Sequence, residues 1–154
     1  MEHAQAKKRG GAPVGHMSDL DPIEAAAVLY LRMWSDGQIG QDRMTRDFET
    51  AFGAAAGRDA MSAFDALCSH CARYGRRPLM RHALTCSCLG ADECCFANLI
   101  ALAGEGERED AALVASLIVR PDLALGVADL AQEVALNFRR MVAAAGLTHN
   151  KTLH

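Results

Sequence analysis

Aromatic residues are scarce in this chain, since Phe, Trp and Tyr together make up only 5% of it. A core with so few rings must be built from many small aliphatic contacts, which favours closely packed helices. Long apolar runs are missing as well, and none approaches the roughly 20 residues that a membrane-spanning helix needs. No apolar stretch follows the basic residues near the N-terminus, so no secretory signal is predicted and the expected compartment is the cytoplasm.

Familiar enzyme motifs are also absent. The sequence contains no glycine-rich phosphate loop, no nucleophile elbow and no H-E-x-x-H segment. Lysine is rare, with 3 residues against 13 arginines, and the net charge is -3. Because nonspecific binding to nucleic acid depends on clustered positive charge, this mild acidity argues against a nucleic-acid partner.

Small apolar residues dominate what is present. Alanine occupies 29 of the 154 positions, and 51% of the chain is hydrophobic. A chain of this length can remove about 70% of its unfolded surface from water, so a single core is sufficient. The composition therefore predicts one globular domain.

The spacing of apolar residues predicts helices along most of the chain, because it repeats every three to four positions. The first helix starts at Asp21 and Pro22, an N-cap followed by a proline at the first helical position. Glycines and prolines separate the later helices. With no convincing strand, the sequence predicts an all-α, single-domain bundle of about six helices.

A loop bearing cysteine and histidine is expected between the third and fourth main helices. The third helix is predicted to begin near Asp59, and Pro78 is expected to start a short helical turn that ends at Leu84. Residues 85–91 are predicted to form a loop, and Asp92 is predicted to cap the next helix.

Two tails are expected to flank the helical domain, which is predicted to span residues 19–147. Residues 1–18 are basic and carry almost no large apolar side chain, so a disordered tail is predicted there. Met17, just before a helix-start signature, is an alternative start of the natural chain, in which case residues 1–16 are not native. Residues 148–154 are expected to fray.

The main chemical signal is a cluster of one histidine and four cysteines within 14 residues, in the order H-x3-C-x-C-x5-C-C from His82 to Cys95. Thiolates and imidazole are the ligands that zinc prefers, and a tetrahedral structural site takes four of them. The sequence therefore predicts a zinc site. Its expected ligands are His82, Cys86, Cys88 and Cys95.

The fourth ligand of this site is left open between several cysteines. Cys95 is expected to share an inward face with Leu99, whereas Cys94 shares its face with Asn98. Cys68 and Cys71 lie on an apolar helical stripe, where a cysteine behaves as a small hydrophobe, so they are predicted to be core residues. They stay alternatives to Cys95 as the fourth ligand.

One basic cluster precedes the cysteines and consists of Arg73, Arg76, Arg77 and Arg81. Cations in the last turn of a helix offset its dipole, which explains part of this cluster without a ligand. A bound anion or an acidic partner is the alternative interpretation.

Four protein ligands leave no open position on zinc, so a structural role is favoured over catalysis. The favoured function is therefore a small regulatory or protein-interaction module that is not an enzyme. The alternative is a thiol-disulfide or peroxide-reducing enzyme that uses Cys68 and Cys71, or the cluster from Cys86 to Cys95.

Overall fold

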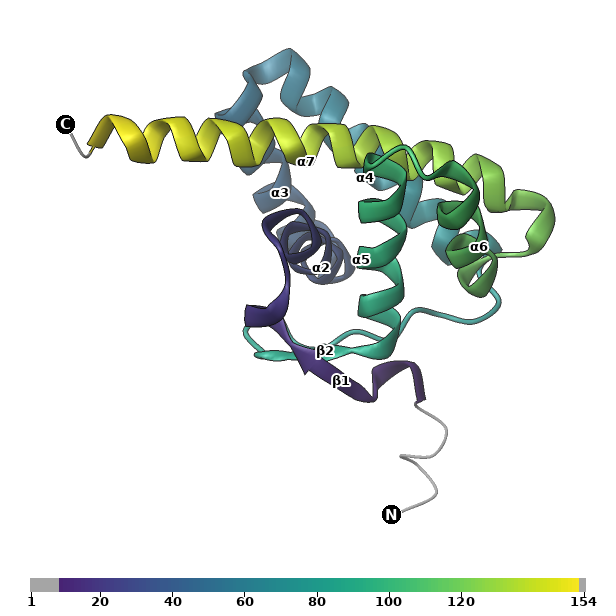
Figure 1. The fold of residues 1–154 in the computed structure, drawn as a ribbon. Coiled ribbons are helices and arrows are strands. Elements are labelled where there is room, and N and C mark those ends of the chain that lie inside the picture. The colour runs from purple at the N-terminus through teal and green to yellow at the C-terminus, as the bar shows by residue number, and fades with distance from the viewer. Residues whose placement is uncertain (1–8, 153–154) are drawn as a thin grey trace.

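The computed structural model describes the chain from residue 9 to residue 152, and the side chains of residues 9–146. Within this range it confirms the all-α fold, with six α-helices and a single two-stranded antiparallel sheet (Figure 1). In chain order the elements are η1 (Arg9–Gly11), β1 (Pro13–His16), η2 (Met17–Asp19), α2 (Pro22–Ser35), α3 (Gly37–Phe52), α4 (Ala54–Tyr74), β2 (Cys88–Gly90), α5 (Ala91–Gly104), α6 (Arg108–Ile118), η3 (Pro121–Leu123) and α7 (Ala124–Thr152).

Helix α7 is the longest element and runs along one side of the molecule, while the sheet lies at the opposite side (Figure 1). Helix α5 connects these two sides, because it begins directly after β2 and packs against α7. α7 continues past Thr148, where the sequence predicts that the chain frays. None of the described helices is long and apolar enough to cross a membrane.

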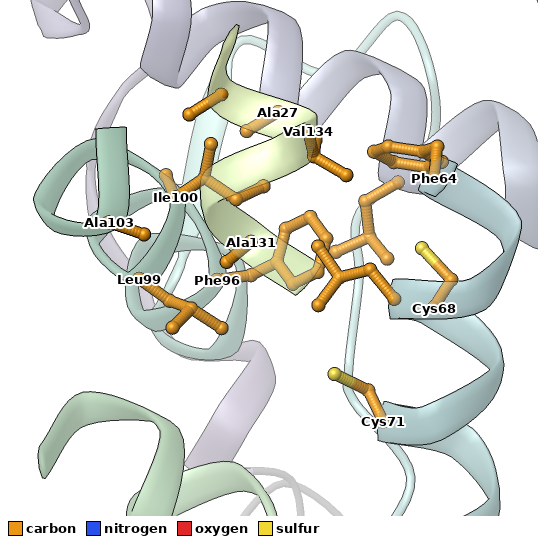
Figure 2. Packing of buried hydrophobic residues seen from close by; sticks show 14 of the residues in the cluster. Ala27, Phe64, Cys68, Cys71, Phe96, Leu99, Ile100, Ala103, Ala131 and Val134 are labelled. Atoms are coloured by element: carbon orange, nitrogen blue, oxygen red, sulfur yellow. The ribbon is translucent and has the colours of Figure 1, made fainter. Parts of the chain in front are cut away.

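The few aromatic residues are concentrated in the centre of the bundle. Phe48, Phe64, Phe96 and Phe138 come from α3, α4, α5 and α7, and each is at most 1% exposed. The Phe64 ring is 6.1 Å from that of Phe96 and 5.8 Å from that of Phe138. Small residues such as Ala27, Ala103 and Ala131 fill the space around these rings (Figure 2). Tyr30 of α2 joins the phenylalanine rings, with its ring 5.1 Å from that of Phe48 and 5.7 Å from that of Phe138. Rings from five helices thus form the middle of a core that is otherwise mainly aliphatic.

Close helix contacts depend on small residues, as the alanine content predicts. A Cβ atom on Gly57 would lie 2.5 Å from the Cα atom of Glu49 in α3, so this glycine lets α4 approach the α3 backbone. Gly57 also lies inside α4, which begins at Ala54 and not near Asp59 as predicted. The helix therefore includes a glycine in its first two turns. Glycine destabilises a helix by about 1 kcal/mol relative to alanine, and the close packing against α3 offsets this loss.

The N-terminal segment differs from the predicted disordered tail. Residues 1–8 lie outside the described part of the chain, but residues 13–16 form β1, which pairs with β2. Two further backbone bonds hold this segment, from Met17 N–H to the Ser87 carbonyl (2.8 Å) and from Ala91 N–H to the Ala12 carbonyl (3.0 Å). Main-chain hydrogen bonds stabilise the segment, and a prediction from apolar content does not detect them.

The chain between α4 and β2 also differs from prediction, because residues 78–84 form no helical turn. Their backbone donors bond to carboxylates of α5 instead: Met80 N–H donates to Asp92 (2.7 Å) and His82 N–H donates to Glu93 (3.3 Å). Asp92 is therefore not the cap of α5. Gly90 occupies the N-cap position, and its N–H donates to the Glu93 side chain at 3.0 Å.

Candidate functional site

A buried ion pair lies beneath the cysteine loop. Arg32 of α2 and Glu93 of α5 have side chains that are 1% and 0% exposed, and two hydrogen bonds of 2.6 and 2.8 Å join them. Burial is the largest single effect on Glu93 and raises its pKa, but the hydrogen bonds and charge of Arg32, together with the N–H groups of Gly90 and His82, outweigh it and lower the pKa. Both groups are therefore charged at neutral pH.

The other hydrogen bonds of Arg32 and Glu93 go to backbone groups of the cysteine loop. Arg32 donates to the carbonyl oxygens of Cys86 and Cys88, each at 2.8 Å. Glu93 accepts from the backbone N–H groups of His82 and Gly90. A buried ion pair is tolerated when such bonds satisfy its remaining donors and acceptors. The pair thus sets the backbone position of the loop from residue 82 to residue 90.

A second carboxylate fixes the start of the same loop. Asp92 accepts two hydrogen bonds from the Arg77 guanidinium, at 2.6 and 2.7 Å, in addition to the bond from Met80 N–H. Gly10 lies directly against this group, because a Cβ atom there would be 2.1 Å from an Asp92 carboxylate oxygen. The N-terminal segment and the loop therefore meet at Asp92.

His82 joins the N-terminal segment to Cys86. Its Nε2 atom is 2.8 Å from the carbonyl oxygen of Gly11, and its Nδ1 atom is 3.5 Å from Cys86 Sγ. A carbonyl oxygen only accepts hydrogen bonds, so Nε2 carries a proton. In the neutral ring Nδ1 is then unprotonated and faces the thiol, which is the arrangement that a base needs to take the thiol proton.

The environment of Cys86 favours a thiolate. The hydrogen bond with His82 is the largest cause, and the backbone N–H and thiol of Cys88 add to it, so that the pKa of Cys86 is below that of an ordinary thiol. The same contact with Cys86 raises the pKa of His82. Cys86 is also partly exposed, so an external reagent can reach it. Low pKa with partial exposure is the combination that reactive cysteines share.

The predicted zinc ligands are only partly brought together. His82 and Cys86 are in contact and Cys88 adjoins Cys86, whereas the charges that act on Cys95 come from Cys94, Asp92 and Arg77. Burial is the largest effect on Cys95 and raises its pKa, and the nearby Cys94 and Asp92 raise it further. Among the residues that the structure describes, no group of three or more His, Cys, Asp or Glu side chains is arranged to hold a metal ion.

Cys68 and Cys71 are core residues, as predicted. Both are 2% exposed, and Figure 2 shows their sulfur atoms projecting from α4 into the packed interior. Burial raises the pKa of Cys71 to about 12 and that of Cys68 well above its ordinary value. These two thiols are therefore protonated and shielded at neutral pH. Cys94 lies beside Asn98, whose side-chain amide is 3.7 Å from its sulfur, as the helical spacing predicts.

The predicted arginine cluster separates into residues with different partners. Arg77 is bonded to Asp92, and Arg76 donates to the Ser116 carbonyl at 2.9 Å. Arg73 lies over the Tyr74 ring at 5.5 Å. Arg81 makes only a long contact of 3.4 Å with the Leu79 carbonyl, within the described part of the chain. Of the four arginines, Arg81 therefore has the weakest interactions with the rest of the fold.

Three residues of the site, Arg32, Glu93 and Gly11, were not predicted from the sequence. Arg32 carried a usable signal, because it follows buried Val28 by four positions and so places a charge on an apolar helical face. A charge at such a position requires a buried partner. Nothing in the sequence identifies the Gly11 carbonyl as the partner of His82, since the contact depends on the strand pairing of β1 with β2.

Comparison with known proteins identifies no relative of this chain: no model of a protein family matches it, and no curated protein or solved structure is detectably similar. The function of the protein is therefore inferred from the geometry of its site.

The buried ion pair generates a stability prediction. Glu93→Gln leaves the Arg32 charge buried without a counterion, which we expect to lower the free energy of unfolding by about 3 kcal/mol or more in urea titrations. Asp129→Asn is the matched control, because the Arg108–Asp129 pair is 57% and 53% exposed. Because solvent screens an exposed pair, the loss for Asp129→Asn should be much smaller than that for Glu93→Gln.

The same comparison has a defined pH dependence. Because the folded-state pKa of Glu93 is lowered, the stabilisation by its carboxylate is complete above the unfolded-state pKa of about 4.3 and is lost as the pH falls through the folded-state pKa. The difference in stability between wild type and Glu93→Gln should therefore shrink in acid. Equal losses for the Glu93 and Asp129 variants at pH 7 would contradict the role given to the buried pair.

Proposed function

We propose that this protein acts by thiol-disulfide exchange, with Cys86 as the attacking thiolate, His82 as its base and Cys88 as the resolving thiol. The observation that carries the proposal is the 3.5 Å contact between Cys86 Sγ and His82 Nδ1, in a ring whose Nε2–H is fixed on the Gly11 carbonyl. A nucleophilic thiol, a base within reach and a group that orients the base are the parts such chemistry needs.

The exchange proceeds in two steps. His82 takes the proton of Cys86, and the thiolate attacks one sulfur of a disulfide; a mixed disulfide with Cys86 forms, and the other half leaves as a thiolate that is then protonated. Cys88 loses its proton and attacks Cys86 Sγ, which releases the second half as a thiol. The substrate disulfide is reduced to two thiols, and Cys86 and Cys88 are oxidised to a disulfide.

The separation of Cys86 and Cys88 suits a transient bond. With one residue between them, the disulfide closes a small, strained ring, and strained disulfides are easily reduced again. The backbone N–H and the thiol of Cys88 both act on Cys86 and lower its pKa, so the two residues are already neighbours. The expected compartment is the cytoplasm, where the resting state of such a pair is the dithiol.

Zinc binding by His82, Cys86, Cys88 and Cys95, and a role as a regulatory or interaction module, stay predictions. We favour thiol exchange over zinc binding because it requires only three residues, His82, Cys86 and Cys88, and these are already in contact. A zinc site on these ligands needs Cys95 to join them.

The role of His82 as base is tested by the pH dependence of alkylation. We expect Cys86 to react with iodoacetamide with a midpoint below the ordinary thiol pKa of about 8.5, because its thiolate is stabilised. In His82→Gln the midpoint should move upward, so that the rate falls at pH 7 and matches wild type at high pH. Mass mapping of the Cys86 peptide follows the rate.

His70→Gln is the control for this experiment, because His70 is exposed on α4 and contacts the Ala66 carbonyl and the Tyr74 ring, neither of which belongs to the pair of His82 and Cys86. It should leave the Cys86 profile unchanged. An identical profile in wild type and His82→Gln would show that His82 does not activate this thiol.

The role of Cys88 is tested by trapping. Wild type exposed to a small disulfide should end lighter by two hydrogen atoms, with Cys86 joined to Cys88, whereas Cys88→Ala should keep the mixed disulfide on Cys86. Cys94→Ala, which removes another partly exposed thiol, should behave as wild type. A mixed disulfide that persists in wild type, or a bond between other cysteines, would refute the assignment.

A further inference from the structure

A hollow of about 650 Å³ lies beside His82, the base proposed for Cys86, and two arginines give its lining positive charge. Its wall includes the side chains of Arg9, Arg81 and His82, together with Met80 and the chain from Gly11 to Pro13. No carboxylate belongs to this lining. The N-terminal segment forms one side and the loop before β2 forms the other, so the hollow exists because the segment is docked on the molecule.

The charges of the two arginines that line the hollow are not neutralised by a nearby carboxylate among the described residues. Within the described residues, neither Arg9 nor Arg81 belongs to an ion pair, whereas the neighbouring Arg77 is held by Asp92. An arginine fork matches a carboxylate in shape and offers two parallel hydrogen bonds to it. Two guanidinium groups without ion-pair partners line the same hollow, so the hollow suits a small molecule with more than one carboxylate.

His82 connects this hollow to the reactive thiol. One side of its ring is held by Gly11, which also lines the hollow, and the Nδ1 atom on the other side is 3.5 Å from Cys86 Sγ. Cys86 itself does not line the hollow, but a molecule held by Arg9 and Arg81 would lie next to His82, the residue that contacts its sulfur. Binding and reaction would occur at neighbouring places on the same loop.

We propose that this hollow binds the carboxylates of a small anionic disulfide, and that such disulfides, of the class formed by acidic amino-acid or short-peptide thiols, are the preferred substrates of Cys86. The inference rests on the proposed thiol exchange and adds a substrate class to it. The anionic half held by the arginines becomes the half that forms the mixed disulfide with Cys86, and the other half leaves as a thiol.

The test compares exchange rates with three disulfides of different charge. Oxidised glutathione is anionic, bis(2-hydroxyethyl) disulfide is neutral and cystamine is cationic; mass mapping records modification of Cys86 in each case. The measured quantity is the ratio of the anionic rate to the cationic rate. We expect this ratio to fall about threefold to tenfold in Arg81→Gln or Arg9→Gln at low salt, and to fall in wild type when salt is added.

Arg58→Gln is the matched control, because it removes the same charge from an exposed position of α4 that does not line the hollow. Its ratio should equal that of wild type. Comparing ratios between variants cancels the different intrinsic reactivities of the three reagents, and Arg9 and Arg81 are exposed, so their replacement should not disturb the fold.

The outcomes separate this inference from the proposed function. If both hollow variants keep the wild-type ratio, or if Arg58→Gln lowers it equally, the anion site is wrong although thiol exchange stands. If Cys86 of wild type reacts with none of the three disulfides faster than a cysteine of the unfolded chain does, thiol exchange itself is wrong.

Discussion

The buried ion pair between Arg32 and Glu93 is the interaction on which the arrangement of the site depends. The chain between α4 and α5 has little regular structure of its own, yet its backbone takes a defined path because four of its polar groups bond to these two side chains. Burial makes each of those bonds costly to lose. The pair thus places the backbone of Cys86 so that its sulfur meets His82.

The N-terminal segment completes the site by a different means. Its strand leaves Val14 56% exposed, although Met17 packs against the core. The segment is held mainly by the pairing of β1 with β2 and by backbone bonds at Met17 and Ala91. Its Gly11 carbonyl orients His82, and Arg9 together with residues 11–13 forms one wall of the cationic hollow. The thiol, its base and the hollow therefore share one small part of the structure, where two segments far apart in the sequence meet.

Much of the fold could be predicted, because helical periodicity is a local property: the start of α2 at Pro22, and the burial of Cys68 and Cys71, follow from spacing alone. The cluster of His82, Cys86 and Cys88 was also visible in the sequence. The strand at Pro13–His16 and the extended path of residues 78–84 were not, since both result from hydrogen bonds to distant residues. For the same reason spacing could not show that Arg77 acts on Cys95, since the bonds from Arg77 to Asp92 bring it there.

Cys86 should be the most reactive of the six cysteines, and limited alkylation measures this difference in reactivity. Native protein would be treated at neutral pH with less than one equivalent of iodoacetamide, and peptide mass mapping would then locate the label on the six sites. The structure predicts that the label lies mainly on Cys86, whose thiolate is stabilised and partly exposed. A label mainly on Cys94, Cys95 or Cys88, with Cys86 unmodified, would contradict it.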